Sequence, residues 1–492
     1  MTLPIALYST AQVRGLDAHA IEQLKIPGYT LMTRAGEAAL RCLRTRWPTA
    51  HRLVIVCGSG NNAGDGYVLA RFAQAAGLTV RVLAAAPPEE LKGDARRAYE
   101  DYEASEGTVS AFAPELLSAG EVIVDALLGT GLKGAVREDL AAVIRAINRA
   151  GNPVFALDVP SGLDSDAGTV AGDAIRAEAT VTFVGLKTGL FMGDGPEHTG
   201  TIFFDDLGLD EAPQPALAPR LTRIVETEIH AALPRRPRAA NKGDFGRVLI
   251  VGSGPGFPGA ARLAGEACLR VGAGLVTVAV APENVTAIAA GRPELICMAL
   301  GNETVLAEVL RRVDVVAIGP GLGRTPWARA ALRVVLGSGK PLVVDADALN
   351  LVSEGGAPAH VDWILTPHPG EAGRLLGVSA QDVQRDRLGA LERLIDRYRG
   401  TVVLKGAGTL VGAAGRTPGL CERGNPGMAT AGTGDVLTGT IVGVLAQCHD
   451  TWVAARVGVL VHAMAGDAAA RDGERGVLAG DLVRELHHFV NP

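Results

Sequence analysis

Several absences narrow the classes of protein to which this chain can belong. No uninterrupted apolar run reaches the roughly 18 residues of a membrane span, and the chain does not open on a basic segment followed by an apolar one. The six cysteines form no C-x-x-C pair and lie mostly among apolar neighbours, which argues against disulfides and a thiolate zinc site. We therefore expect a cytoplasmic protein with no membrane partner, whose cysteines belong to the core.

An excess of positive charge is also lacking. The formal net charge is -6, and the one dense basic run, PRRPR at residues 234–238, is short and interrupted by proline. We expect a linker there and no nucleic-acid partner. Lysine is scarce as well, with seven among 47 basic residues. Lysines in glycine-rich segments, such as Lys133, Lys187, Lys242 and Lys405, are therefore candidates to reach a phosphate or a reacting centre, although chance placement is the alternative.

Strand-like apolar runs alternate with helical stretches in both halves of the chain. This pattern predicts two doubly wound α/β units. Proline-rich sequence with no periodicity places the boundary between residues 210 and 240, and we expect domains over residues 1–215 and 225–492. The predicted strands are residues 53–57, 79–85, 121–125, 153–158 and 180–184 in the first half, and residues 247–251, 275–280, 314–318, 341–345 and 402–404 in the second.

Glycine, acidic and amide residues follow three predicted strands of the first half. The segments are GSGNNAGDG, DALLGTGLKGA and DVPSGLDSD. The first joins a strand to a helix as phosphate-binding loops do, yet it fits neither G-x-G-x-x-G nor G-x-x-x-x-G-K-[ST] cleanly. Because open α/β sheets bind ligands at the carboxyl ends of their strands, we expect the three segments to form one site.

Two kinds of chemistry are suggested by these segments. Asn62, Asp125 and Ser161 offer only oxygen ligands, which suits a hard cation such as K⁺, Na⁺, Mg²⁺ or Ca²⁺. Asp158 follows a strand and is a candidate general base, and Lys133 lies in a glycine loop from the neighbouring strand, so that an acid and a base would face one carbon. For each residue, turn or helix capping is the alternative.

Together and in this order, the three segments resemble the NAD(P)H-hydrate epimerase family over roughly residues 10–208. The resemblance implies a Rossmann-like domain whose loop binds the diphosphate of hydrated NADH or NADPH. It also implies that Asn62, Asp125 and Ser161 hold K⁺ and that Lys133 and Asp158 are the catalytic pair. The implied substrate-binding residues are Asn61, Asn62, Ala63, Gly64, Asp65, Gly129, Thr130, Gly131, Leu132, Lys133, Gly134, Ala135 and Asp158.

The second half contains GNPGMATAGTGDVLTGT, residues 424–440. Gly432 and Gly434 free backbone N–H groups at the start of an apolar helix, and Asp435 lies in its first turn, which predicts an anion hole beside a carboxylate base. A plain glycine-rich helix start is the alternative. Lys405 and His368 each lie at a further strand end, although a lone histidine is more often a structural hydrogen-bond partner. The DFG at residues 244–246 has no H-R-D or V-A-I-K partner, so a protein kinase is not indicated.

AGTGD resembles the G-A-G-D anion hole of ribokinase-like enzymes. With NKGDFGRVLIVGSGPGFPGAA, GPGLG, DADALN, TPHPGE and KGAGT, the half resembles the ADP-dependent NAD(P)H-hydrate dehydratase family. The resemblance implies a ribokinase-like α/β sandwich that uses ADP and Mg²⁺, with Asp435 as the base that deprotonates the substrate hydroxyl. The implied binding residues are Ala260, Gly321, His368 and Asp435 for the hydrate, and Lys405, Gly406, Ala407, Gly408, Thr409 and Gly434 for ADP.

The leading hypothesis is a bifunctional metabolite-repair enzyme. It interconverts the R and S forms of the hydrates and dehydrates the S form at the expense of ADP, giving AMP and phosphate. Its partners would be small molecules, and we expect a homo-oligomer. One rival is a ribokinase-like kinase for a small alcohol such as a vitamin precursor, with the first half as a separate partner. Another makes the first half a binding module without catalysis.

Overall fold

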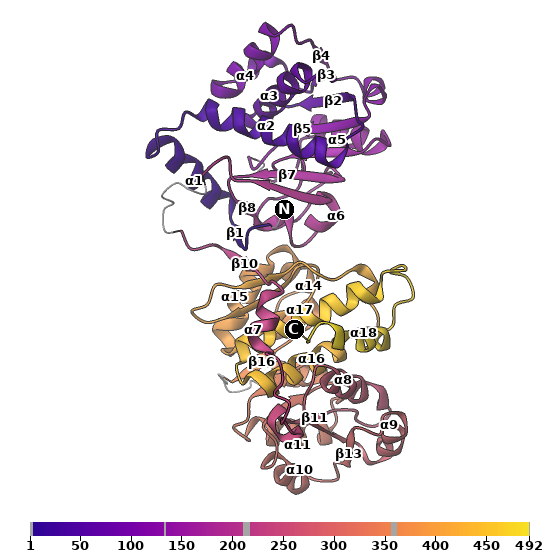
Figure 1. Cartoon of the computed structure of the whole chain (residues 1–492). Coiled ribbons are helices and arrows are strands. Elements are labelled where there is room, and N and C mark those ends of the chain that lie inside the picture. Colours follow the sequence, from indigo (N-terminus) through magenta and orange to yellow (C-terminus); the bar gives the residue numbers. More distant parts are fainter. Residues whose placement is uncertain (1–2, 132–133, 210–216, 356–361, 492) are drawn as a thin grey trace. The chain divides into compact units, whose positions relative to one another are not determined.

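A computed structural model describes residues 3–131, 134–209, 217–355 and 362–491 (Figure 1). The chain divides into two compact units, Met1–Leu221 and Thr222–Pro492. Within the described ranges, none of the helices combines the length and apolar character needed to cross a membrane. Four cysteines are buried and two are half-buried, and all six are free thiols.

The first unit is built on a sheet of seven parallel strands in the order β4-β3-β2-β5-β6-β7-β9. The chain runs outward from β2 to β4 and then returns to β5 on the other side of β2. The point between β2 and β5 is therefore the topological switch, where such sheets bind ligands. The strands are β2 (Arg52–Cys57), β3 (Thr79–Ala84), β4 (Val109–Ala111), β5 (Val122–Ala126), β6 (Val154–Leu157), β7 (Ala179–Phe183) and β9 (Thr201–Asp205).

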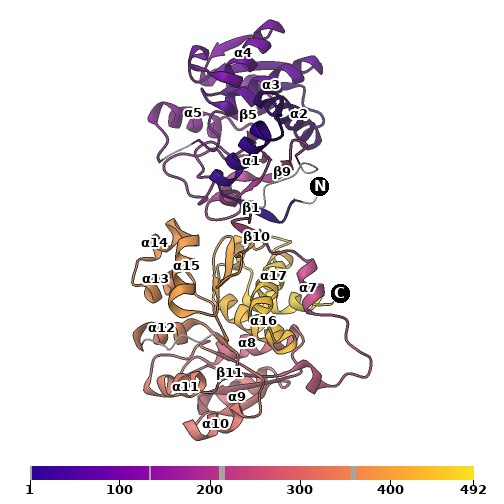
Figure 2. The same cartoon turned by 90° about the vertical axis from the view of Figure 1, so that its left-hand side faces the viewer.

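Both faces of this sheet are covered. Leu53 and Ile55 of β2 pack into the core under α2 (Gly28–Arg46), α3 and α4, whereas Val54 and Val56 pack into the core under α5. Figure 2 shows α5 on one side of β5 and α2 and α3 on the other. Burial on both faces explains why the strand reads as a continuous apolar run. The other elements of this unit are β1 (Ala6–Tyr8), α1 (Thr10–Glu22), α3 (Asn61–Ala75), α4 (Gly93–Ala104), α5 (Glu138–Arg149), β8 (Leu186–Lys187) and α6 (Gly195–Thr199).

The second unit has a larger sheet in the order β13-β12-β11-β14-β15-β16-β17-β18-β19-β10. The seven strands from β13 to β17 are parallel, and β18 runs antiparallel to both of its neighbours. Its switch point lies between β11 and β14. The strands are β10 (Leu221–Arg223), β11 (Arg247–Val251), β12 (Leu275–Val280), β13 (Ile296–Ala299), β14 (Val315–Ile318), β15 (Leu342–Val344), β16 (Trp363–Leu365), β17 (Thr401–Leu404), β18 (Thr409–Ala413) and β19 (Gly419–Cys421).

Helices also sandwich the second sheet. Figure 2 shows α12, α13 and α15 on one side of the unit and α16 and α17 on the other. The core beneath α8, α16 and α17 is almost wholly aliphatic, so α16 is held rigidly along its length. The helices are α7 (Thr227–Ala232), α8 (Pro258–Arg270), α9 (Val285–Gly291), α10 (Glu303–Leu310), α11 (Pro326–Leu336), α12 (Ala346–Gly355), α13 (Pro369–Leu376), α14 (Ala380–Arg385), α15 (Arg387–Tyr398), α16 (Thr433–Cys448), α17 (Thr451–Ala469) and α18 (Ala479–Glu485).

The predicted fold class is confirmed, because both units are α/β with largely parallel sheets. Each strand predicted from the sequence is present, with its ends within one residue of the prediction.

Candidate functional site

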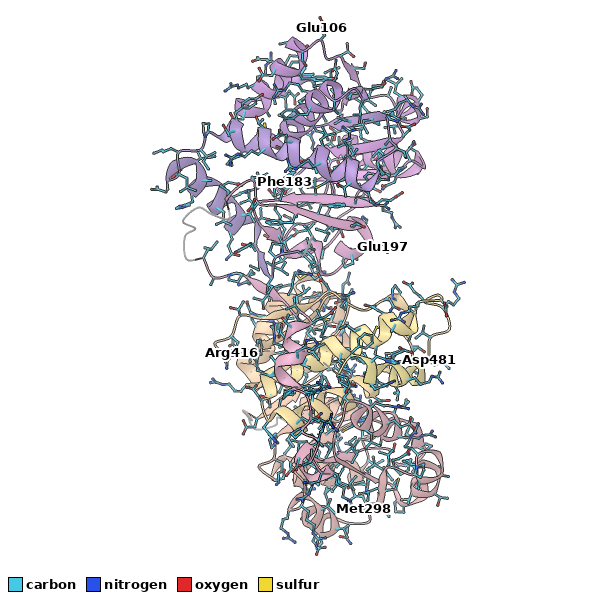
Figure 3. The ribbon with its side chains drawn as sticks, viewed as in Figure 1. Glu106, Phe183, Glu197, Met298, Arg416 and Asp481 are labelled. Carbon is cyan, nitrogen blue, oxygen red and sulfur yellow. The ribbon has the colours of Figure 1, made fainter. Side chains whose placement is uncertain are left out.

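A cavity of about 720 Å³ lies at the carboxyl ends of the central strands in the first unit. Its walls include Gly58 after β2, Leu127 after β5 and Asp158 after β6. Phe183, which Figure 3 labels near the end of β7, also lines it. A cavity of this size at a topological switch point suits a small-molecule or cofactor ligand.

Two glycines allow the close packing that shapes this cavity. A Cβ on Gly58 would lie 2.1 Å from the carbonyl oxygen of Leu127, so the loops after β2 and β5 can approach only without a side chain there. A Cβ on Gly66 would lie 2.7 Å from that of Ala126, so α3 packs directly on the sheet. The N-terminus of α3, beginning at Asn61, is thereby fixed at the cavity wall, where its free N–H groups favour an anion.

The three predicted cation ligands lie together beside this cavity. Ser161 donates hydrogen bonds to the Asp125 carboxylate from Oγ (2.6 Å) and from its backbone N–H (2.8 Å). Asn62 Nδ2 donates to the carbonyl of Leu128 (2.7 Å), whose N–H donates to Ser161 Oγ (2.8 Å). Asn62 Oδ1 is buried without a hydrogen-bond partner. This set of oxygens, one of them unpaired, fits a hard cation.

Asp158 lies beside a buried cation in the same cavity. Lys187, only 1% exposed, donates hydrogen bonds from Nζ to the Asp158 carboxylate, to Thr182 Oγ1 (3.0 Å) and to the carbonyl of Phe183 (2.9 Å). Asp158 has a φ of 65°, a left-handed conformation that aspartate tolerates better than most residues. The ammonium therefore neutralises this carboxylate and holds it in one orientation.

In the second unit, the turn before α16 brings a carboxylate and a helix N-terminus together. Gly432 caps the helix with a φ of 91°, and Asp435 lies in the first turn. Burial, with smaller contributions from Asp345 and Asp347 and opposed by Lys405, raises the pKa of Asp435 to about 7. A carboxyl with this pKa is poised to accept a proton near neutral pH.

Lys405, at the end of β17, stands close to this turn. A Cβ on Gly434 would lie 3.6 Å from its Nζ. The same Nζ donates to Asp345 Oδ1 (2.8 Å) and is 3.8 Å from Glu371. Although burial alone would raise it, Lys405 and the hydroxyl of Thr438 hold the pKa of Asp345 below its usual value. Asp345 therefore fixes the position of the ammonium beside the helix N-terminus.

Arg387 holds the loop that follows Lys405 through hydrogen bonds to its backbone carbonyls. This arginine is 2% exposed, and its guanidinium donates to the carbonyls of Leu404 (3.3 Å), Lys405 (3.4 Å) and Gly408 (3.2 Å). Burial lowers the pKa of Arg387 to about 10. Gly406 has a φ of 136°, and a Cβ there would lie 2.8 Å from the guanidinium. The loop geometry therefore depends on both residues.

The remaining predicted residues of this unit gather at neighbouring strand ends. A Cβ on Gly321, whose φ is 57°, would lie 2.9 Å from Ala260 Cβ, so the start of α8 and the loop after β14 are in contact. His368 caps α13, because its Nδ1 accepts hydrogen bonds from the N–H groups of Gly370 (3.0 Å) and Glu371 (3.4 Å). Its side chain is half-exposed, and its Nε2 lies 3.4 Å from the Glu371 carboxylate.

Comparisons with known proteins agree with this geometry. Residues 28–189 match the family model of the YjeF-related protein N-terminus, and residues 248–488 match that of NAD(P)H-hydrate dehydratase. A bifunctional NAD(P)H-hydrate repair enzyme from Coxiella burnetii is 48% identical, covering 99% of each chain. Another from Escherichia coli is 42% identical, covering 100% of this chain and 95% of the relative. The chain belongs to the family of bifunctional NAD(P)H-hydrate repair enzymes.

A solved structure agrees with the fold of the second unit. A ribokinase-like superfamily protein from Enterococcus faecalis is 31% identical with a TM-score of 0.52, covering 56% of this chain and 98% of that protein. The two units of this repair-enzyme family member thus correspond to the two family models.

The structure places most of the residues predicted for the first site of this repair-enzyme family member. The cavity is lined by eight of them: Asn61, Asn62, Asp65, Gly129, Thr130, Gly131, Ala135 and Asp158. Ala63 and Gly64 lie on the buried side of α3, Ala63 in the core and Gly64 close to Met32. Gly134 is exposed. Leu132 and Lys133 lie outside the described residues, so the pairing of Lys133 with Asp158 stays a prediction.

Several functional candidates in this member of the repair-enzyme family were missed as site residues. Lys187 was indicated only by the scarcity of lysine, and its partner could not be read from the sequence. Asp345 lies in a motif that was recognised, but its contact with Lys405 is a tertiary one. Asp17, which lines the cavity of the first unit from α1, and Arg387 carry no sequence signal, because neither follows a predicted strand.

Proposed function

We propose that the chain repairs hydrated NADH and NADPH through two activities. The domain over residues 1–215 interconverts the R and S hydrates, and the domain over residues 225–492 converts the S hydrate to NAD(P)H while ADP becomes AMP and phosphate. The observation that carries the proposal is Asp435 in the first turn of α16, where a proton acceptor stands beside N–H groups suited to a phosphoryl oxygen. A homo-oligomeric state and a cytoplasmic location stay predictions.

The dehydration follows from the chemistry of the hydrate. Its C6 hydroxyl is a poor leaving group, but transfer of the terminal phosphoryl group of ADP converts it to a phosphate ester. Asp435 takes the hydroxyl proton as the oxygen attacks phosphorus, and Gly434 with neighbouring N–H groups stabilises the phosphoryl oxygens. Departure of phosphate and loss of a proton from C5 then restore the dihydropyridine.

The nucleotide would lie over residues 405–409, with Ala260, Gly321 and His368 beside the hydrate. Mg²⁺ would supply charge neutralisation on the phosphates when bound. Within the ranges that the structure describes, no group of three or more His, Cys, Asp or Glu side chains is arranged to hold a metal. We therefore propose that Mg²⁺ arrives with ADP.

Epimerisation requires a planar C6. The hydroxyl-bearing C6 is bonded to the ring nitrogen N1, whose lone pair can form a C6=N1 bond as the hydroxyl leaves as water. Water then returns to either face. Because C6–H is not next to a carbonyl group, we place the proton transfer at oxygen, with the Asp158 carboxylate accepting the proton of the incoming water. Asn62, Asp125 and Ser161 would hold K⁺ at the cavity wall, where the unpaired Asn62 Oδ1 supports a cation.

The test uses a mixture of R and S hydrates with ADP, Mg²⁺ and K⁺, followed by the absorbance of the dihydropyridine band. The proposal expects nearly complete recovery of NADH from both epimers. Consumption of nucleotide with some other alcohol and no recovery would instead support a small-molecule kinase. Recovery that stops at the S fraction, with R consumed no faster than in buffer, would make the first domain a binding module.

The pH dependence of dehydration should report Asp435. Because this base must be ionised to act and its pKa is raised to about 7, activity is present above that pH and lost below it. We expect kcat/KM for the S hydrate to fall roughly tenfold per pH unit below about pH 7 and to level off above it. Initial rates at varied hydrate concentration and saturating ADP check this, and a flat profile down to about pH 5.5 would exclude Asp435 as the base.

Epimerisation should require K⁺, and the Asn62 side chain should contribute to binding this ion. In Asn62→Ala, we expect the K⁺ concentration that gives half-maximal epimerisation to rise about tenfold or more, because the unpaired oxygen is removed. The measurement is interconversion of the purified S hydrate without ADP, over a K⁺ series balanced with tetramethylammonium. Near-normal epimerisation at saturating K⁺ shows that the first unit, which carries the substitution, is folded. An unchanged K⁺ requirement would contradict the assignment.

A further inference from the structure

One wall of the cavity in the first unit is formed by α1, an element outside the strand-end site predicted from the sequence. Val13, Arg14, Asp17 and Ile21 line the cavity from this helix. Arg14, Asp17 and Ile21 are spaced by three and four residues, and Val13 lies four before Asp17, so the set lies on one helical face. Asp158, directly after β6, and Lys187, in β8, line the same cavity. Asp17 therefore brings a second carboxyl group to the volume that Asp158 faces.

Asp17 is half-buried, and within the described residues its side chain makes no hydrogen bond or ion pair. Asp158, by contrast, is paired directly with the Lys187 ammonium. A polar group that faces a cavity without a protein partner is available to a ligand. The two carboxyl groups thus have different environments, one neutralised by a cation and one free to hold a proton.

The pKa of Asp17 agrees with this difference between the environments of the two carboxyl groups. Burial, with a smaller contribution from the Asp158 carboxylate and opposed by Lys187 and Arg14, raises the pKa of Asp17 to about 6. Asp65 of α3 lines the same cavity, and burial, with smaller contributions from Asp158 and Asp17, raises its pKa well above the usual value. A carboxyl group with a raised pKa, such as Asp17, beside a carboxylate that is paired with an ammonium, such as Asp158, can divide the roles of acid and base.

We propose that Asp17 is a catalytic acid in the epimerisation. Its carboxyl proton passes to the C6 hydroxyl as the C6–O bond breaks and the N1 lone pair forms the C6=N1 bond. Water then adds to the opposite face of C6, its proton passes to the Asp158 carboxylate, and the π pair returns to N1. Proton exchange with solvent resets both groups. This inference rests on the proposed epimerase function and assigns the acid that it requires.

The test is interconversion of the purified S hydrate without ADP, in the full chain, with the R hydrate measured by chromatography. For Asp17→Asn we expect the epimerisation rate to fall about 100-fold or more, towards the rate in buffer. Asp17→Glu should recover part of it. Glu22→Gln, which removes an exposed carboxylate from the same helix outside the cavity, should match the wild type. Dehydration of the S hydrate with ADP should be unchanged in all three variants.

The pH profile of epimerisation distinguishes a catalytic role of Asp17 from a role in positioning other groups. The acid must be protonated, so wild-type kcat/KM for epimerisation should fall roughly tenfold per pH unit above about pH 6, and Asp17→Asn should lose this limb. An unchanged rate in Asp17→Asn, or a lowered rate with the limb intact, would overturn the proposal. If the wild type forms R hydrate no faster than buffer does, the proposed epimerase function itself is wrong.

Discussion

Asp435→Asn is expected to lower the kcat for dehydration by about 10²- to 10⁴-fold, because the hydroxyl proton then has no acceptor. The substitution keeps the shape of the side chain in the first turn of α16. It also removes a negative charge from beside the proposed site of the ADP phosphates. ADP should therefore bind as tightly as in the wild type or more tightly, which separates loss of the base from loss of the nucleotide site.

The experiment measures NADH recovery from the S hydrate and, separately, ADP binding by calorimetry. Asp472→Asn is the matched control, because it removes an exposed carboxylate from the same unit. Epimerisation by the Asp435→Asn chain should be normal, and retained ADP binding shows that the second unit, which carries the substitution, is folded. Dehydration within a few fold of the wild type would exclude Asp435 as the base, and weakened ADP binding would assign it to nucleotide binding instead.

The sequence predicts most of the central strands of each sheet, but not the outer strands and not β16, which lies between β15 and β17. β2 and β11 can be predicted from the sequence because strands that are buried on both faces are apolar along their length. β16 and β19 have three residues each, which gives a weak pattern, although β15 is equally short and is predicted. β13 is an edge strand with an exposed Ile296, so its burial pattern differs from that of the central strands.

The candidate sites divide in a similar way. Asn62, Asp125 and Asp435 were found because the topology of a parallel sheet and the start of a helix place them at a ligand. Asp17 and Arg387 were not, because α1 and α15 approach their sites through tertiary packing that no local pattern records. The sequence thus indicates the residues that come directly after a strand, but not which helix closes over them.

Both sites contain a lysine paired with an aspartate that follows a strand, and one member of each pair is buried: Lys187 in its pair with Asp158, and Asp345 in its pair with Lys405. The scarcity of lysine drew attention to both cations, yet it could not supply their partners. A buried ion pair stabilises a fold weakly but holds its members in one arrangement. In each site, the pair therefore fixes a charged group near the proposed reacting atoms.

The ion pair of Lys187 with Asp158 in the first unit is the basis of a second prediction with a large expected effect, which concerns epimerisation. Asp158→Asn should lower the rate of epimerisation about 100-fold or more, because the acceptor for the proton of the incoming water is lost. Asparagine suits this position since it tolerates the observed φ of 65°, whereas alanine would add left-handed strain of about 1 to 2 kcal/mol. A defect in Asp158→Asn therefore reports chemistry more cleanly than one in Asp158→Ala.

Asp158→Asn also leaves Lys187 buried without its counter-charge. Breaking a buried pair costs about 3 to 5 kcal/mol, so the first unit should unfold at a lower temperature. In Asp158→Asn/Lys187→Met the unpaired charge is gone, and much of this stability should return while epimerisation stays absent. Thermal unfolding and S-to-R interconversion, measured on the same samples, distinguish a catalytic role of Asp158 from a purely structural one. If the double variant regained activity along with stability, Asp158 would be a structural partner of Lys187 rather than the base.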